Sequence, residues 1–307
     1  MILFERDADG EKRHILLFGS GLIGSAIDAA VRRQRRWAAR PVAWSWHDRV
    51  QRAAVAAEIS RRIKGASRID IIWAAGISGF ASSDPDMAAE TAQIGEILAL
   101  TKQLAQTNDQ LVFHLFSSLG GLYEGQRSIG SQSAAIAKRP YGRGKIEQES
   151  LVGALGGNIT PRIYRPSSVY GYTSGGRRGL FATMIASMIA YRPIEIYGSA
   201  HTLRDYVFAP DIAAFVAHSL ELAPTRATEL VASGKPTSVA ETIAILERLV
   251  DRRALCRYAS APHNALDMTV QRIALPAALP RTPLLVGIAS VFQQMSRSLI
   301  CQPYQPR

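Results

Sequence analysis

The stretch His14-Ile-Leu-Leu-Phe-Gly-Ser-Gly-Leu-Ile-Gly24 decides the fold that we expect for this chain. A short apolar run that breaks into glycines is typical of a buried strand followed by a tight turn. Residues 25–36 continue as a helical stretch, and residues 41–46 form a second apolar run. Together these segments predict a βαβ unit of about 30 residues.

The alternation of apolar and helical segments continues along the chain. Three further apolar runs are expected to be strands, and one segment rich in Ala, Leu, Ile, Glu and Gln is expected to be a helix. The strands are 69–75, 110–116 and 159–164, and the helix is 87–106. Strands that alternate with helices at this spacing indicate the α/β class, with a doubly wound parallel sheet between two layers of helices.

The pattern changes after residue 166, where Gly, Pro and Tyr become frequent and residues 180–190 form the next helical stretch. Ser238-Val-Ala-Glu241 is a capping box, which predicts a helix from residue 238 to 250. We therefore expect one domain at residues 1–165 and a smaller, mixed α/β lobe at 166–307. The segment 204–222 is expected to return to the first domain.

Gly19, Gly21 and Gly24 stand between a predicted strand and a predicted helix, where a dinucleotide-binding loop requires glycine. The first permits the tight turn, the second lets the backbone approach a pyrophosphate, and the third lets helix and strand pack closely. The N-terminus of the helix then faces the phosphate charge. The loop therefore predicts an NAD(P)-binding domain of the Rossmann type, with a plain glycine turn as the alternative.

Further cofactor contacts are expected near this loop. Asp48 could bind the ribose hydroxyls of NAD, whereas Arg49, or an arginine of the preceding helix, could bind the 2′-phosphate of NADP. Because no acid stands directly at the end of the second apolar run, the sequence slightly favours NADP. The other expected cofactor contacts are Leu22, Ile23, Ala74, Ala75, Gly76 and Lys145.

A group of residues suited to proton transfer lies further along the chain. Tyr141-Gly-Arg-Gly-Lys145 follows a Ser117-Ser118 pair that closes the run 110–116. Four residues are about one helical turn, so the Tyr141 and Lys145 side chains are expected on one face of a helix. An ammonium beside a phenol favours the phenolate, and a serine hydroxyl nearby could bind the same substrate oxygen. These groups together indicate proton transfer at an alcohol or a carbonyl.

Composition excludes several classes of protein. The 307 residues are 47% hydrophobic and 20% charged, which is ordinary for a globular protein. Two cysteines exclude a disulfide framework, and the six histidines show no metal-ligand spacing, so we expect no metal. No run approaches about 18 apolar residues and the N-terminus does not resemble a signal peptide, so we expect no membrane span and a cytoplasmic location.

The formal net charge is +11, and arginines are concentrated between residues 32 and 62. Such a concentration is typical either of a face that binds nucleic acid or phosphorylated ligands, or of a solvated helix surface. No RRM, KH or zinc-finger pattern accompanies it. We therefore favour the solvated surface and expect no nucleic-acid partner.

Four motifs occur in a characteristic order. They are Phe116-Ser-Ser-Leu-Gly-Gly-Leu-Tyr123, Tyr141-Gly-Arg-Gly-Lys145, Arg165-Pro-Ser-Ser-Val-Tyr-Gly171 and Arg204-Asp205-Tyr206. With the glycine loop, they resemble the extended branch of the short-chain dehydrogenase/reductase superfamily, the nucleotide-sugar epimerases, dehydratases and reductases. The likeness runs from about residue 14 to 290 and is specific for the superfamily but not for a substrate.

The resemblance implies a role for each matched residue. Tyr141 would be the general acid/base, and Lys145 would activate it and bind the nicotinamide ribose. Ser118, in preference to Ser117, would bind the reacting oxygen. The implied substrate contacts are Ser117, Ser168, Arg177 and Arg204, of which Arg204 would bind a diphosphate. The alternatives are that Ser117 satisfies backbone groups, that Arg204 pairs with Asp205 to brace the second lobe, and that Arg177 is merely solvated.

The chain also departs from the pattern of this superfamily. Ser168 stands where the pattern has Asn, and no Asn occurs near Ala92, where it would belong to a buried polar relay. The residues after Ser118 are Leu119-Gly120-Gly121, whereas 4,6-dehydratases usually carry an acid pair there. This departure favours epimerisation or carbonyl reduction over dehydration.

We therefore expect an NAD(P)-dependent epimerase or ketoreductase that acts on a nucleotide-activated sugar. Two alternatives stay open. One is an NADP-dependent reductase of another small carbonyl compound, and the other is a non-catalytic, dinucleotide-binding regulator. Because related enzymes often pair through two long helices, a homodimer is expected, with the helix of Tyr141 as a candidate contact.

Overall fold

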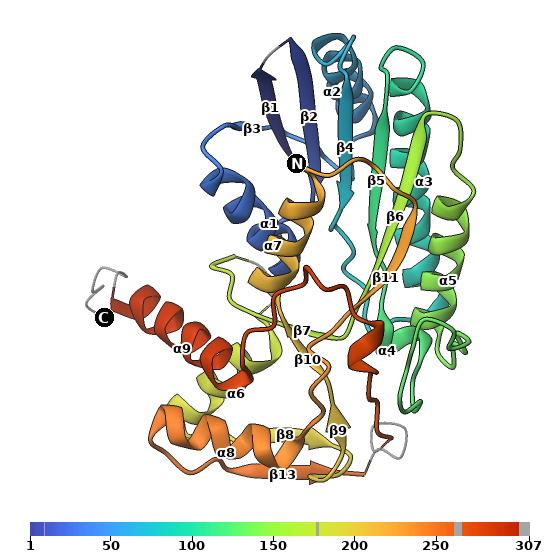
Figure 1. The fold of residues 1–307 in the computed structure, drawn as a ribbon. Helices are drawn as coiled ribbons and strands as arrows, with labels where there is room; N and C mark the ends of the chain where they lie inside the picture. Colours follow the sequence, from blue (N-terminus) through green and yellow to red (C-terminus); the bar gives the residue numbers. More distant parts are fainter. Residues whose placement is uncertain (9, 176–177, 261–265, 301–307) are drawn as a thin grey trace.

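A twisted sheet flanked by helices forms the larger part of the molecule, and a smaller group of helices and short strands lies below it (Figure 1). The structure, a computed structural model, describes residues 1–8, 10–175, 178–260 and 266–300. The predicted α/β class is confirmed, because strands and helices alternate along the chain around a mainly parallel sheet.

The central sheet has seven strands in the described part of the chain. From one edge to the other they are β11 (Ala227–Val231), β6 (Ile159–Pro166), β5 (Leu111–Phe116), β4 (Arg68–Trp73), β2 (Glu11–Phe18), β1 (Ile2–Ala8) and β3 (Ala38–Pro41). The first five run parallel to one another. The strands expected at 69–75, 110–116 and 159–164 are therefore confirmed as β4, β5 and β6.

The position of β1 in the sheet is the main departure from the expected topology. β1 pairs antiparallel with β2, where Ile2 lies opposite Leu17, and antiparallel with β3, where Ile2 lies opposite Pro41. The βαβ unit expected from the two apolar runs is therefore interrupted by another strand. The strand expected at 41–46 is also wrong, because β3 ends at Pro41 and residues 42–46 are irregular.

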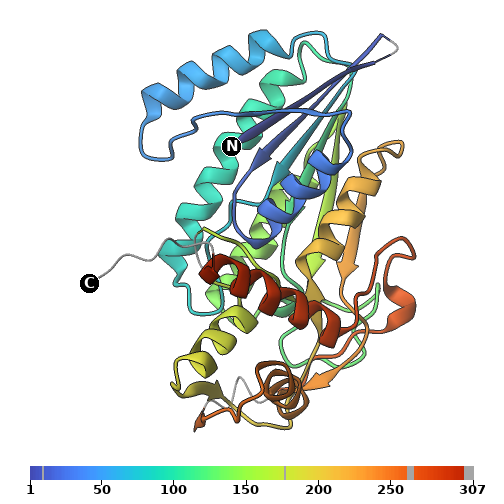
Figure 2. The same cartoon turned by 90° about the vertical axis from the view of Figure 1, so that its left-hand side faces the viewer.

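Helices cover both faces of the sheet, as expected (Figures 1 and 2). One face carries α1 (Leu22–Arg33) and α7 (Ala209–Ser219), and the other carries α2 (Arg49–Arg62), α3 (Asp84–Leu104) and α5 (Pro140–Gly153). Successive side chains of a strand point to opposite faces. In β2, Leu16 and Phe18 accordingly join the core under α2 and α3, whereas Ile15 and Leu17 join the core under α1 and α7.

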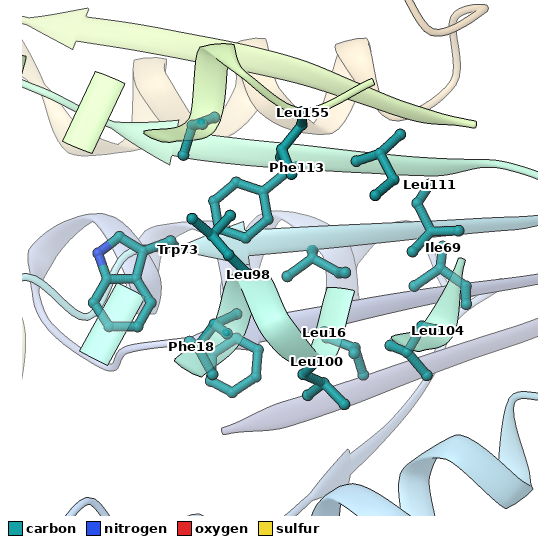
Figure 3. Packing of buried hydrophobic residues seen from close by; sticks show 14 of the residues in the cluster. Leu16, Phe18, Ile69, Trp73, Leu98, Leu100, Leu104, Leu111, Phe113 and Leu155 are labelled. Atoms are coloured by element: carbon teal, nitrogen blue, oxygen red, sulfur yellow. The ribbon is translucent and has the colours of Figure 1, made fainter. Parts of the chain in front are cut away.

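Aromatic side chains extend the core under α3 to the carboxyl ends of the strands (Figure 3). Trp73 closes β4 and is 1% exposed. The ring of Trp46 lies 5.5 Å from that of Trp73, and the ring of Trp44 lies 5.2 Å from that of Phe18. Trp44 and Trp46 are partly buried and pack against the core although they lie outside any strand, and edge-to-face aromatic packing holds the irregular segment onto the sheet.

The helix starts follow local capping rules. At α3, the Ser83 hydroxyl accepts the N–H of Asp86, and the Asp86 carboxylate accepts the N–H of Ser83. The capping box predicted at Ser238 and Glu241 is confirmed, and it opens α8 (Val239–Val250). Each reciprocal pair satisfies N–H groups that the helix leaves without a partner.

The smaller lobe has a core of its own, formed by α6 (Leu180–Ile189), β8 (Ile194–Tyr197), α8, β13 (Cys256–Ala259) and α9 (Leu284–Ile300). It lies at the carboxyl ends of the parallel strands (Figure 1). Between its segments the chain returns to the larger part through α7 and β11, so the returning stretch reaches beyond the expected 204–222. The domain boundary at residue 165 stays a prediction.

Candidate active site

The loop between β2 and α1 requires glycine at two positions. Gly19 has a φ of +107°, and a Cβ on it would lie 2.1 Å from the carbonyl oxygen of Ala74. A Cβ on Gly24 would lie 2.2 Å from the carbonyl oxygen of Gly19. Gly19 therefore lets the loop pass against the end of β4, and Gly24 lets α1 pack onto the loop.

Gly21 leaves space at the start of α1. It is the N-cap of the helix, where no side chain caps the first turn and no acidic residue is present in it. A Cβ on Gly21 would meet no atom within 4 Å. Uncapped N–H groups beside open space suit a bound phosphate. The loop geometry therefore fits the pyrophosphate of a dinucleotide.

The other expected cofactor residues occupy different surroundings. Ile23, Ala74 and Gly76 line a cavity at the carboxyl ends of the strands. The Leu22 side chain instead reaches toward Gly171 and Gly179 in the next lobe, and Ala75 packs against the core under α3. The contacts of these residues with a cofactor stay predictions.

Asp48 and Arg49 lie at the start of α2, beyond the irregular segment that follows β3. The Asp48 carboxylate caps α2 by accepting the N–H of Gln51 at 2.9 Å. Both side chains are exposed. The possible role of an α1 arginine at a 2′-phosphate does not fit the structure. Arg32 and Arg33 lie in the last turn of this 12-residue helix, about 18 Å from the glycine loop at its start.

Several of the clustered arginines are held by acids rather than left open for an anion. The ion pairs are Arg32 with Asp28, Arg36 with Glu221, Arg52 with Glu96 and Arg62 with Glu5. Surface pairs of this kind contribute little to stability but lower the local positive potential. They support the interpretation of this region as a solvated surface.

The expected catalytic residues surround one cavity of about 260 Å³. Ser117 and Ser118 follow β5 directly, while Tyr141 and Lys145 come from the first two turns of α5. All four line the cavity together with three of the expected cofactor contacts, Ile23, Ala74 and Gly76. Motifs that are far apart in the sequence thus converge where parallel strands end, which is the usual ligand site of such sheets.

The two serines have different hydrogen bonds. The Ser118 hydroxyl caps α4 (Leu119–Leu122) by accepting the N–H of Gly121 at 3.0 Å, so its own proton remains for donation. The Ser117 hydroxyl is buried and has no hydrogen-bond partner in the part of the chain that the structure describes. The alternative that this hydroxyl satisfies backbone groups is therefore wrong, and its contact with a ligand stays a prediction.

Two glycines of the Tyr-x-x-x-Lys segment fix the position of α5. A Cβ on Gly142 would lie 2.2 Å from the carbonyl oxygen of Gly121 in α4, and a Cβ on Gly144 would lie 2.5 Å from the Met87 side chain in α3. The half-buried Tyr141 ring lies close to Gly121 as well. Close approach on both sides of α5 holds the tyrosine beside the cavity.

Lys145 is held by a buried carboxylate that was not predicted from the sequence. Its ammonium donates to Oε1 of Glu90 at 2.8 Å and to Oε1 of Gln148 at 3.0 Å. The other oxygen of Glu90 accepts the N–H groups of Ile77 and Ser78, each at 3.0 Å. Burial would raise the pKa of the Glu90 carboxyl, but the charge of Lys145 and these hydrogen bonds lower it to about 2.

A helical pattern in the sequence contained the signal for Glu90. Met87 and Ile94 are core residues of α3, and Glu90 stands three residues after the first and four before the second. This spacing puts Glu90 on the buried face of the helix. A carboxylate on a buried face requires a charged or hydrogen-bonding partner, which here is Lys145.

A larger cavity of about 310 Å³ adjoins the first, and Phe80 lines both. Two of the expected substrate contacts, Ser168 and Arg204, lie in its wall. The Arg204 guanidinium donates to the carbonyl oxygens of Leu203 and Leu266, and burial lowers its pKa. Arg177 lies outside the described residues.

Beside Arg204, Asp205 anchors the wall of the larger cavity. Its buried carboxylate accepts the Ser167 hydroxyl at 2.7 Å and the N–H groups of Ser233 and Gly234 at 2.8 and 2.7 Å. These contacts tie β10 (Tyr206–Phe208) to the segment that follows β11. Asp205 therefore braces the second lobe with neutral donors.

The rest of the larger cavity is mainly apolar. Its apolar lining includes Phe80, Leu180, Met184, Ile196, Tyr206, Val239, Leu266 and Met268. Two carboxylates, Glu124 and Glu195, also line it, and Glu124 forms a two-pronged ion pair with Arg139 whose shortest distance is 2.6 Å. Neither carboxylate was predicted from the sequence.

The described residues were also searched for metal-binding groups and for membrane-spanning helices. Within those residues there is no group of three or more His, Cys, Asp or Glu that could hold a metal ion. No helix among them is long and apolar enough to cross a membrane.

Comparison with known proteins gives one family and a set of similar structures. The profile of the "NAD dependent epimerase/dehydratase family" matches residues 19–228, more than half of the chain. A search of curated proteins by sequence finds no match.

The similar structures have low sequence identity but share the fold over most of their length. MoeE5 in complex with UDP-glucuronic acid and NAD is 21% identical, with a TM-score of 0.74, and the match covers 92% of this chain and 99% of MoeE5. UDP-glucose 4-epimerase of Thermus thermophilus in complex with NAD is 20% identical, with a TM-score of 0.73 and coverages of 92% and 99%. UDP-glucuronic acid 4-epimerase of Bacillus cereus, in complex with UDP-glucuronic acid and NAD, is 19% identical, with a TM-score of 0.63 and coverages of 78% and 79%.

Proposed function

The chain belongs to the NAD-dependent epimerase/dehydratase family, and on that premise we propose that it is an NAD(P)-dependent epimerase or ketoreductase of a nucleotide-activated sugar. One observation carries the proposal. Ser118, Tyr141 and Lys145 line the same cavity as Ile23 of the glycine-loop segment. Hydride and proton transfer need these groups side by side.

Each residue has a chemical task in this proposal. A bound nicotinamide would supply hydride transfer to and from a substrate carbon. Tyr141 takes the hydroxyl proton as the alcohol is oxidised and gives it back as the carbonyl is reduced. Lys145 binds the ribose, and the Ser118 hydroxyl donates to the reacting oxygen.

NAD is the cofactor that the observations support better. The sequence slightly favoured NADP, but the three similar structures above contain NAD. The 12-residue length of α1 also removes its terminal arginines from the cofactor site. Asp48 remains the proposed partner of the ribose hydroxyls, and Arg49 is the remaining candidate for a 2′-phosphate.

The larger cavity is the proposed site of the nucleotide-sugar. Two of the similar structures contain UDP-glucuronic acid, a molecule with a diphosphate between nucleoside and sugar. Arg204 lines this cavity and would meet the diphosphate, with Arg177 as a further candidate. Ser168, in the same wall, and the Ser117 hydroxyl of the first cavity would contact the sugar.

Epimerisation or reduction fits the site better than dehydration. Elimination of water needs an acid and a base in addition to the tyrosine. The residue after Ser118 is Leu119, which is fully buried in an apolar cluster, and Gly120 and Gly121 follow it. None of the three offers a titratable side chain.

A panel of nucleotide-sugars tests the substrate class. In the presence of saturating NAD, at least one UDP-, GDP- or dTDP-sugar is expected to raise the unfolding temperature by about 5 °C, since binding to the folded state stabilises it. The measurement is thermal unfolding with each sugar and with the matching free nucleoside as control. If NAD stabilises the protein and no nucleotide-sugar adds to the effect, the substrate is of another class.

The apolar lining favours one other candidate, an NADP-dependent reductase of a less charged carbonyl compound. Glu124 and Glu195 are each held in an ion pair, with Arg139 and Arg257, and Arg204 is the one described cation in the lining. A set of uncharged aldehydes and ketones, assayed by NADPH oxidation, separates this candidate from the first. A non-catalytic regulator is disfavoured because Tyr141 and Lys145 are both in place.

The homodimer stays a prediction. α5 and α3 pack together on one face of the sheet, and Ile146 and Leu151 of α5 are 38% and 41% exposed. Exposed apolar side chains on a long helix are suited to pairing with a second copy.

A further inference from the structure

Glu90 connects three parts of the proposed active site. It belongs to α3, it binds the ammonium of Lys145 in α5, and it binds the N–H groups of Ile77 and Ser78 in the segment after β4. It is 3% exposed. Gln148 completes the cluster, because its amide donates to Oε1 of Glu90 and accepts from Lys145.

The carboxylate changes the charge of the cavity. Among the described residues that line the cavity, Lys145 is the one charged side chain. Glu90 lies directly behind it, with 2.8 Å between carboxylate and ammonium. In a buried setting neither charge is screened by water, so the two largely cancel at the position of a ligand.

The two forms of a nicotinamide cofactor differ in the charge of the reacting ring. The oxidised ring is a cation and the reduced ring is neutral. A lone ammonium in the cavity would therefore disfavour the oxidised form more than the reduced form. A neutral ion pair removes this bias.

We propose that Glu90 is a positioning residue that neutralises the cavity through Lys145, so that the site retains oxidised cofactor as well as reduced cofactor. This inference rests on the proposed function and sharpens it. A reaction that starts by oxidising its substrate, as epimerisation through a keto sugar does, needs the oxidised cofactor at rest. A ketoreductase needs the reduced one. A site that holds both forms fits epimerisation, which needs the oxidised form at rest and the reduced form later in the cycle.

The decisive quantity is the ratio of the dissociation constants for NAD⁺ and NADH, measured by calorimetry. Glu90→Gln preserves the shape of the side chain and removes its charge. It is expected to raise the ratio by about tenfold, because Lys145 then acts on the ring without compensation. A purely structural role would weaken both cofactors alike and leave the ratio unchanged.

Three further variants complete the test. Lys145→Met removes the positive charge and leaves Glu90, so the ratio is expected to fall. Glu90→Gln combined with Lys145→Met removes both charges and is expected to return the ratio to within about twofold of the wild type. Gln148→Met removes a neutral contact of the same lysine and is expected to leave the ratio unchanged.

The outcomes separate this inference from the proposed function. If the wild type binds neither NAD⁺ nor NADH, the proposed function fails and the inference fails with it. If the wild type binds both and the ratio stays constant through all the charge variants, Glu90 has no electrostatic role and only the inference is overturned. If Glu90→Gln fails to fold, the other two variants still test the inference. It predicts that the ratio falls in Lys145→Met and returns to the wild-type value in the double variant.

Discussion

Tyr141→Phe is expected to lower turnover by about a hundred- to ten-thousand-fold, while the affinity for dinucleotide changes by less than about twofold. The substitution removes one hydroxyl and leaves the ring. That ring packs 5.8 Å from the ring of Phe80, and Lys145 lies 5.8 Å from its centre, so a phenylalanine fits the same space. The loss should therefore appear in kcat, measured with the substrate identified by the thermal panel, and not in calorimetric dissociation constants.

Tyr123→Phe is the matched control for this prediction. Tyr123 is a buried tyrosine whose hydroxyl accepts from Arg165, and it lines neither cavity. This control variant should be less stable but should keep its turnover once folded. Unchanged turnover in Tyr141→Phe would remove Tyr141 from the mechanism, and equal losses in both variants would point to a structural cause.

Gly19→Ala is expected to abolish dinucleotide binding and to lower the free energy of unfolding by about 3 kcal/mol or more. The new Cβ would lie 2.1 Å from the carbonyl oxygen of Ala74, at a φ of +107° that L side chains rarely adopt. Because the obstacle is backbone at the end of the central strand β4, the loop must move as a whole. Urea unfolding and calorimetry with NAD measure the two effects.

Gly21→Ala separates cofactor binding from folding. A Cβ on Gly21 meets no protein atom within 4 Å and its φ of −72° suits alanine, so stability without cofactor should stay within about 0.5 kcal/mol of the wild type. The methyl group would occupy the space assigned to the pyrophosphate, so affinity for NAD should fall by at least about tenfold. Wild-type affinity in Gly21→Ala would place the dinucleotide elsewhere.

Local rules made the glycine loop and the shared face of Tyr141 and Lys145 predictable. Gly19 and Gly24 are required by contacts within a single strand-turn-helix unit and the strand beside it, and Tyr141 and Lys145 share a face through the pitch of one helix. The capping box at Ser238 is equally local. Each of these features follows a pattern of residues close together in the sequence, so the residue pattern alone was sufficient.

The insertion of β1 was not predictable in the same way. It depends on Ile2 pairing with both Leu17 and Pro41, which is a competition between distant strands rather than a local preference. An Asp9-Gly10 dipeptide between two apolar runs is a known hairpin signal that the sequence-based prediction did not use. Even with that hairpin, the displacement of β3 to the edge follows only from the assembled sheet.

The buried ion pair between Glu90 and Lys145 could not be predicted from the sequence either. The spacing in α3 places Glu90 on the buried face, but its partner in α5 is 55 positions away in the sequence. The superfamily pattern pointed instead to an Asn near Ala92, which this chain lacks. In the structure, a carboxylate close to that position in α3 contacts the lysine directly, and this contact required the three-dimensional packing of α3 against α5.

A dinucleotide bound at the glycine loop beside Tyr141 is the central claim on which the proposed function depends. Calorimetric titration of the wild type and of Gly21→Ala with NAD⁺, NADH, NADP⁺ and NADPH tests it most directly. We predict one dinucleotide per chain for the wild type, with NAD forms bound more tightly than NADP forms, and weakened binding in the folded variant. Absence of binding for all four cofactors, or equal binding by both proteins, would contradict the claim.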